Sequence, residues 1–261
     1  MDGRVDPGRI QRAAAASCDP DVVCFQEVAD NYDSLAGSAG ENQPEILAGL
    51  FPGYSAHFAC AVDVPDGKGG RRRFGNMILS RLPVRQVFRH SLPWPAEAEV
   101  PNMPRVALEA VIETPWGPVS VVTTHLEYYS ARQRAEQVER LCELQAERSR
   151  HAVAKPAQKP GPFEPFDRPA ASILTGDFNM PPGDPQVARL RATWKDAWLV
   201  AHPGLAHPAS FGLYDKQFGT DPYCCDFVFA TPELASRIAS VRIDQETQAS
   251  DHQPVIVEFR P

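Results

Sequence analysis

Short polar segments lie at the ends of several apolar, strand-like runs in this sequence. Four of them are Gln26-Glu27, Thr123-Thr124-His125, Gly176-Asp177-Phe178-Asn179 and Ser250-Asp251-His252, and a further carboxylate, Asp226, begins the run 226–230. Each segment is expected on a rim loop over a packed sheet. Together they supply carboxylates, imidazoles and a carboxamide, the groups that bind a hard cation and cleave a phosphate ester.

Strand-like runs alternate with helical segments along the chain. Apolar runs predict strands at 21–25, 58–64, 74–79, 106–114, 119–124, 171–175, 226–230 and 254–259, with a weaker candidate at 241–243. Helical spacing or composition predicts helices at 8–17, 44–51 and 185–200, and a strong helix that starts at Ser130. This order predicts an α/β fold in which stacked sheets carry helices on their outer faces. We expect a single domain over 1–261, with the proline-rich stretch 154–169 as an exposed loop.

Charge and cysteine usage limit the classes of function. The net charge is −7, with one basic cluster at 68–73, whereas tight sequence-independent nucleic-acid binders usually carry a basic face. A nuclease remains compatible, because bound cations offset local repulsion. Six cysteines without a CxxC pair indicate a reducing compartment. With no membrane-length apolar run and no signal peptide, we expect a cytoplasmic monomer that does not bind membranes.

The polar residues each have a structural explanation beside the functional one. Glu27 ends an apolar run, so its carboxylate needs either a cation or an arginine as partner. Asp177 and Asn179 lie two apart in an extended segment, so they either converge on one phosphate or form a turn. His252 either serves a phosphoryl group, as proton donor or shuttle, or lies on the surface. Asp226 either orients His252 through a hydrogen bond or stands alone at a strand edge.

Two further residues have equally plain structural explanations. His125 ends the run 119–124, where a lone histidine is more often structural than catalytic. Asn76 follows Gly75 inside a strand and is also typical of a β-bulge. The structural explanations are unrelated to one another, whereas a single phosphoesterase site accounts for all of the rim groups together. The sequence therefore favours an enzyme.

The order of these motifs resembles the endonuclease/exonuclease/phosphatase superfamily. The resemblance spans about residues 9–259 and is carried by Gln26-Glu27, Gly75-Asn76 with Leu79-Ser80-Arg81, Thr124-His125, Gly176-Asp177-Phe178-Asn179, Asp226 and Ser250-Asp251-His252. It implies a four-layer α/β sandwich, in which two mixed β-sheets pack face to face with helices outside.

The resemblance also implies a role for each motif residue. Mg²⁺ or Mn²⁺ would be held chiefly by Glu27, with Asp251 nearby. Asp177 would position or activate the attacking water, and His252, paired with Asp226, would stabilise the phosphorane or aid proton transfer. The groups implied on the phosphate or substrate side, or as supports of the site, are His125, Asn179, Asn76 and Arg105.

One element of the family pattern is missing from this sequence. Family members begin with a strand that ends in an asparagine at the metal site, and nothing before Asp21 indicates such a strand. We therefore expect a chain that is truncated at its N-terminus relative to the family, either because the start is assigned too late or because the strand is lost.

The substrate is the least constrained prediction. We expect a phosphoesterase that uses a divalent cation and in-line attack of water on a phosphodiester or phosphomonoester. One alternative is a DNA or RNA endo- or exonuclease of the same family. Another is a catalytically impaired member that acts as a binding module. The rim loops show neither a tryptophan-rich stacking segment nor a long basic groove.

Overall fold

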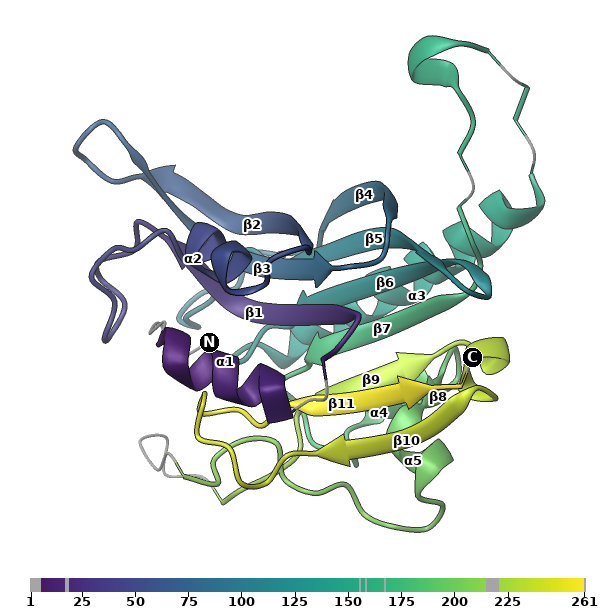
Figure 1. Cartoon of the computed structure of the whole chain (residues 1–261). Helices are drawn as coiled ribbons and strands as arrows, with labels where there is room; N and C mark the ends of the chain where they lie inside the picture. Colours follow the sequence, from purple (N-terminus) through teal and green to yellow (C-terminus); the bar gives the residue numbers. More distant parts are fainter. Residues whose placement is uncertain are drawn as a thin grey trace.

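A large mixed β-sheet forms one inner layer of the molecule (Figure 1). The computed structural model describes residues 6–16, 19–154, 156–157, 159–166, 168–214 and 221–260. The strand order of this sheet is β4 (Val84–Ser91), β5 (Val106–Thr114), β6 (Gly117–His125), β7 (Ser172–Asp177), β9 (Asp226–Ala230) and β8 (Lys195–Asp196). Strands β6 and β7 pair in parallel, and the other neighbours pair antiparallel.

The second inner layer consists of two smaller antiparallel sheets among the described residues. One has the order β1 (Val22–Asp30), β3 (Arg71–Ser80), β2 (Ser55–Pro65), and the other pairs β10 (Ile238–Ile243) with β11 (Val255–Phe259). Strand β3 packs over β5 and β6, β1 over β6 and β7, and β11 over β9. The second layer therefore covers the large sheet in two antiparallel pieces, whereas the family resemblance implied one mixed sheet there. In the described part, helix α1 and not a strand precedes β1.

Helices cover both outer faces, so the predicted four-layer α/β sandwich is confirmed. They are α1 (Pro7–Ala16), α2 (Gln43–Leu50), α3 (Ala131–Val153), α4 (Pro185–Arg191), α5 (Ala197–Ala201) and α6 (Pro232–Ala235). Helix α3 starts where the Ser130 side chain accepts a hydrogen bond from the Gln133 amide. Its buried Val138 and Leu141 share a core with Val122 and Leu174 of the large sheet. On the other side, α1 and α2 share a core with β1 and β3.

The predicted helix over 185–200 is interrupted. Helix α4 ends at Arg191, and β8 then pairs with β9 before α5 begins. The cause is Asp196, whose carboxylate accepts hydrogen bonds from the Trp198 amide and from Arg191. A side chain that caps a new helix and binds the preceding one competes with continuous helix. Leu190 and Trp194 are both buried, so this segment still packs its apolar side chains inward.

The described residues of the stretch 154–169 leave the end of α3 and project from the sandwich before β7 (Figure 1). Its described residues include a single 3₁₀ turn, Gly161–Phe163, and are largely exposed. No helix in the described ranges is long and apolar enough to cross a membrane.

A buried ionic cluster lies between β5 and α3. The Glu109 carboxylate is fully buried and accepts hydrogen bonds from Ser120 and Arg148, at 2.9 and 3.1 Å. His90 Nε2 lies 2.8 Å from the same carboxylate, and Arg168 Nη2 lies 3.5 Å away. Burial raises the pKa of Glu109, but these partners outweigh burial and hold the pKa at about 2. The cluster therefore keeps a charge inside the fold by surrounding it with donors.

Candidate active site

Glu27 lies at a β-bulge in strand β1. The pairing of β1 with β3 shifts between Phe25 and Val28, and Glu27 has a φ of 59°, in the left-handed region. Such a bulge turns a side chain away from the ordinary pleat. The neighbouring Gln26 donates from Nε2 to Thr123 Oγ1 at 2.8 Å, which ties the bulge to β6 in the other layer. The Gln26-Glu27 segment is thereby aimed at the end of the large sheet.

Gly176 allows the next two predicted residues to meet. In the parallel pairing of β6 with β7, His125 is opposite Asp177. A Cβ at position 176 would lie 1.9 Å from the Thr124 carbonyl oxygen, and Gly176 has a φ of 144°. Only glycine fits such an approach of two backbones. The close pairing brings His125 Nε2 to 3.4 Å from Asp177 Oδ2.

His125 connects Asp177 with Glu27. Its Nδ1 lies 3.8 Å from Glu27 Oε1, and its side chain is almost fully buried. Burial and the positive charges of Arg105 and His252 lower the pKa of His125 well below its ordinary value. His125 is therefore a neutral imidazole near pH 7, with one ring nitrogen able to donate and the other able to accept.

His252 is held in the opposite charge state. Its Nδ1 lies 2.8 Å from Asp226 Oδ2, and its Nε2 lies 3.8 Å from Asp177 Oδ2. Burial lowers the pKa of His252, but the carboxylates of Asp226, Asp177 and Asp251 outweigh burial and raise the pKa to about 10. The imidazole is thus positively charged near pH 7, and its ring also packs against Phe211, with 4.7 Å between centroids.

Asp177 lies between the two imidazoles. Burial is the main reason that the pKa of Asp177 rises to about 7, with the positive charge of His252 opposing the rise and the charge of Asp226 adding to it. Its Oδ1 accepts a hydrogen bond from the Asn179 amide at 2.8 Å. A carboxylate with this pKa changes its protonation state near neutral pH, which is the requirement for a general base at that pH.

Asn179 follows Asp177 by two residues, and Asp251 directly precedes His252. Asn179 has a φ of 51°, and its Nδ2 donates to the Leu126 carbonyl at 2.9 Å, so it forms the turn after β7 and also fixes the loop after β6. Asp251 accepts from the Ser250 hydroxyl at 3.0 Å. Burial raises the pKa of Glu27, and the negative charge of Asp251 adds to that rise, so these two carboxylates influence one another.

Arg105 and Asn76 are buried, as His125 and Asp177 are. Asn76 is buried, and its Nδ2 donates to the Val106 carbonyl at 2.9 Å, which joins the two sheets beside Arg105. Arg105 is also buried and donates from Nε to Glu127 Oε2 at 3.2 Å. Among the described residues, its buried Nη1 has no hydrogen-bond partner. A buried donor of this kind is costly unless a ligand satisfies it.

Three residues that support the site were not identified from the sequence. Ser210 donates to Asp226 Oδ2 at 2.7 Å, Phe211 packs on His252, and Glu127 holds Arg105. Only Glu127 had a signal, since it follows His125 by two residues in the motif region. Ser210 and Phe211 come from a loop with no regular pattern, so only the fold brings them to Asp226 and His252.

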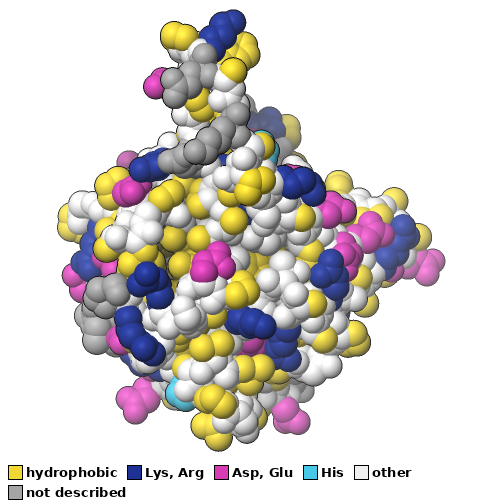
Figure 2. All heavy atoms as spheres, turned by 90° about the vertical axis from the view of Figure 1, so that its right-hand side faces the viewer, with side chains coloured by type: hydrophobic (Ala, Val, Ile, Leu, Met, Phe, Trp, Pro, Cys, Tyr) yellow, Lys and Arg dark blue, Asp and Glu magenta, His cyan; other side chains and the backbone are white. Residues whose placement is uncertain are grey.

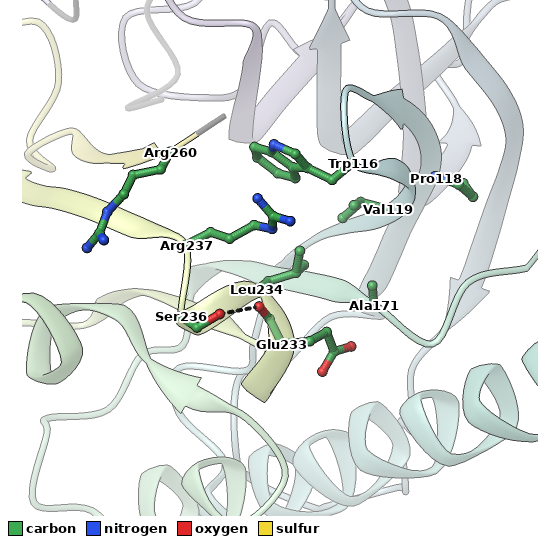
Figure 3. A pocket seen from close by; sticks show the side chains of 9 residues that line it. All are labelled: Trp116, Pro118, Val119, Ala171, Glu233, Leu234, Ser236, Arg237 and Arg260. Atoms are coloured by element: carbon green, nitrogen blue, oxygen red, sulfur yellow. Dashed lines mark hydrogen bonds between the residues drawn. The ribbon is translucent and has the colours of Figure 1, made fainter.

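A cavity of substantial size lies elsewhere, near the turn before β6 (Figure 3). It measures about 490 Å³ and is lined by Trp116, Pro118, Val119, Ala171, Glu233, Leu234, Ser236, Arg237 and Arg260. The Arg237 guanidinium lies 5.3 Å from the Trp116 ring centroid. His125 is at the opposite end of the same strand, roughly 25 Å away at about 3.3 Å per residue, so this cavity is separate from the polar cluster.

On the face that lies at the right-hand side of Figure 1, the described residues form no continuous basic surface (Figure 2). On this face, the described Lys and Arg side chains are interspersed with Asp and Glu, and hydrophobic atoms are exposed between them. The mixture matches the acidic balance of the whole chain.

Comparisons with known proteins point to one family. The model of the family described as Endonuclease/Exonuclease/phosphatase family matches residues 8–252. None of the curated proteins matches the chain. Among solved structures, an endonuclease/exonuclease/phosphatase from Beutenbergia cavernae has a TM-score of 0.68 and 24% identity, and the match covers 99% of this chain and 67% of that one.

Two other solved structures carry more specific descriptions. A 3′ phosphatase from Neisseria bound to a product DNA hairpin has a TM-score of 0.61 and 20% identity, with 97% of this chain and 94% of that chain covered. A mannosyl-6-phosphatase from Bacteroides thetaiotaomicron has a TM-score of 0.63 and 18% identity, with 97% and 89% covered. At these identities the likeness establishes the fold alone.

Proposed function

Because the chain belongs to the endonuclease/exonuclease/phosphatase family, we propose that it is a divalent-metal-dependent phosphoesterase that hydrolyses a phosphodiester or phosphomonoester by in-line attack of water. The family assignment confirms the resemblance found in the motifs. The observation that carries the proposal is the place of Asp177 between two imidazoles of different charge, 3.4 Å from His125 and 3.8 Å from His252.

Asp177, His252 and His125 have different roles in proton transfer and charge stabilisation. Asp177, with its pKa raised by burial to about 7, accepts a proton from the attacking water. His252, positively charged beside Asp226, stabilises the negative charge that develops on the phosphoryl oxygens. His125, neutral because it is buried beside positive charges, donates a hydrogen bond to the phosphate without adding charge.

The donor set at Glu27 and Asp251 fits a hard cation. Both offer carboxylate oxygens, the ligands that Mg²⁺ and Mn²⁺ prefer. Burial raises the pKa of Glu27, and its nearest described basic nitrogen, His125 Nδ1, is 3.8 Å away and belongs to a neutral ring. This carboxylate therefore gains from a positive partner. When bound, the cation would polarise the phosphoryl group towards attack.

Arg105 and Asn179 complete the phosphate side of the proposed site. The buried Nη1 of Arg105, which has no hydrogen-bond partner in the described part of the chain, is the donor that a phosphate oxygen would satisfy, and Glu127 fixes the guanidinium for that contact. Asn179 holds Asp177 through its backbone amide, so we assign it a positioning role as well as contact with the water or phosphate. Asn76, enclosed and bonded to Val106, positions Arg105.

The test uses bis-p-nitrophenyl phosphate and the full chain, with and without Mg²⁺. We expect hydrolysis that stops when EDTA is added and returns with excess Mg²⁺ or Mn²⁺. Asp177→Ala and His252→Ala should each lower kcat by about 10²- to 10⁴-fold, the usual contribution of a general acid or base. Asp33→Ala and His151→Ala, which change exposed residues of the same types, are the matched controls. Turnover that ignores metal removal, or full rates in both site variants, would refute the assignment.

A nuclease of the same family is the second candidate, supported by two exposed tyrosines next to the site. Tyr128 and Tyr129 follow His125 closely and pack edge to face, with 4.8 Å between centroids. Exposed aromatic rings stack on nucleobases, at about 1–3 kcal/mol per base. Nicking of plasmid DNA at a rate that exceeds cleavage of small phosphodiesters, and that falls in Tyr129→Ala, would favour this candidate.

A further inference from the structure

A cysteine thiol lies directly behind the His252–Asp226 pair. Cys225 is fully buried, and its Sγ lies 3.4 Å from Asp226 Oδ2 and 3.9 Å from His252 Nδ1. The third side of this triangle is the 2.8 Å contact between Asp226 Oδ2 and His252 Nδ1. The phosphoesterase proposal uses the imidazole and the carboxylate but gives the sulfur no task.

The triangle has the dimensions of a preformed zinc site. Tetrahedral Zn²⁺ with bonds of about 2.3 Å to sulfur and 2.0–2.2 Å to nitrogen or oxygen separates its ligand atoms by about 3.5 Å. The two edges that involve Cys225 already lie close to that value, and the nitrogen–oxygen edge needs to open by about 0.5 Å. Asp177 supplies a fourth donor, because one ligand atom from each of the four residues lies within 4.8 Å of the others.

We propose that Cys225, Asp226 and His252, completed by Asp177, form a binding site for a thiophilic divalent cation such as Zn²⁺. This site is separate from the hard-cation site proposed at Glu27 and Asp251, which offers only oxygen donors. A thiolate selects Zn²⁺ or Co²⁺ over Mg²⁺ and Mn²⁺ because sulfur is a softer ligand. The two sites therefore discriminate between cations by ligand type.

Charge balance favours the exchange of protons for the metal ion. Binding releases the Cys225 thiol proton and the His252 Nδ1 proton to solvent, and the sulfur and the nitrogen each form a bond to the ion. Two positive charges leave and two arrive, so the net charge of the enclosed cluster does not change. Burial of an uncompensated charge, the usual obstacle to placing an ion in a protein interior, is avoided.

The site has a consequence for catalysis, which rests on the proposed function. A metal on Nδ1 replaces the proton that His252 shares with Asp226, and the same ion occupies Asp177, so the proposed general base can no longer accept a proton from water. Zn²⁺ at this site is therefore an inhibitor. Excess Mg²⁺ should not relieve the inhibition, because the two ions occupy different donors.

The first test is spectroscopic and needs no activity. The full chain, reduced with a phosphine and freed of metal, is titrated with Co²⁺. We expect the near-ultraviolet thiolate-to-cobalt charge-transfer band together with the intense visible absorption of tetrahedral Co²⁺. The band should vanish in Cys225→Ala and persist in Cys224→Ala. Cys224 is a matched control, since it is the adjacent buried thiol and bonds to the Asp226 backbone carbonyl outside the cluster.

Zinc affinity and inhibition provide the second test. Competition with a chromogenic chelator should show Zn²⁺ bound at least 10- to 100-fold more weakly by Cys225→Ala than by the wild type, since even the loss of an outer partner costs that much. In excess Mg²⁺, micromolar Zn²⁺ should inhibit the wild type and Cys224→Ala and spare Cys225→Ala, each relative to its own rate without zinc.

Each outcome decides the proposal. Absence of the charge-transfer band in the wild type, or its survival in Cys225→Ala, refutes the site. If no phosphate ester is hydrolysed under any condition, the function falls while the cobalt spectrum still decides the metal site. Should Cys225→Ala fail to fold by circular dichroism, Cys225→Ser replaces it, because the hydroxyl keeps the size and polarity of the thiol but gives no sulfur band.

Discussion

Replacing Asp226 by asparagine tests the electrostatic core of the proposed mechanism. A His252 pKa of about 10 against an ordinary 6.5 corresponds to about 5 kcal/mol in favour of the charged imidazole. Asp226 is the largest favourable contributor, at 2.8 Å from Nδ1. Loss of an adjacent opposite charge should lower the His252 pKa by roughly 1–3 pH units. Asp226→Asn keeps the size of the side chain and removes only its charge.

The assay is an NMR titration of the histidine ring protons in the metal-free chain. The chain contains seven histidines, so the His252 signal is assigned by its loss in His252→Gln. Asp251→Asn is the control with the same change of charge, and because Asp251 contributes less to the His252 pKa, the shift should be smaller. A wild-type His252 that titrates near 6.5, or equal effects of the two variants, would refute the reasoning.

Asp226→Asn should also change how the unfolding free energy depends on pH. The folded pKa of His252 lies above its unfolded value, so this group stabilises the fold fully below about pH 6.5 and the stabilisation is lost as pH rises through about 10. The difference in unfolding free energy between wild type and Asp226→Asn should therefore be larger at pH 6 than at pH 10. Urea denaturation at the two pH values measures it, and a difference that grows with pH contradicts the assignment.

Two further predictions concern the scaffold. Gly176→Ala places a methyl group 1.9 Å from the Thr124 carbonyl oxygen, so we expect a loss of about 3 kcal/mol or more. Gly183→Ala, whose Cβ meets nothing within 4 Å, should leave the thermal midpoint nearly unchanged, and similar midpoints for both variants would contradict this. For Glu109, the depressed pKa of about 2 gives about 3 kcal/mol of stability that is present above about pH 4.5 and lost as pH falls towards 2. The advantage of wild type over Glu109→Gln should therefore shrink across that range in acid denaturation, and a constant advantage would mean that the Arg148 pair carries no charge-dependent stability.

The sequence predicted best those features for which the local residue pattern also indicates the position in the fold. Apolar runs that end in polar residues predicted both the strands and the polar rim of the sheet. A strand that is buried along its length can carry functional polar side chains only where it ends. The parallel pairing of β6 and β7 then places His125 opposite Asp177, a contact that the motif order anticipates but the periodicity alone does not. The sandwich and the family followed from the same segments.

The sequence failed where a partner distant along the chain decides the local structure. Helical spacing continued through 185–200, but Asp196 caps a new helix and pairs with Phe229 in β9, and the local pattern does not report that pairing. Ser210 and Phe211 could not be predicted for the same reason, since their roles depend entirely on contacts with Asp226 and His252. Loop residues gain their roles from the scaffold that presents them.

The left-handed backbone conformation at Glu27 lowers the stability of the fold, whereas the Glu27 side chain is needed for the proposed chemistry. A non-glycine residue in that conformation costs roughly 1–2 kcal/mol, and the raised pKa of its partly buried carboxylate adds a second cost. Glycine at position 27 would relieve both while deleting the oxygen donors of the proposed ion site. Directed evolution for heat tolerance alone would thus drift towards Glu27→Gly and return a sturdier, inert protein, so any such campaign needs a turnover screen alongside it.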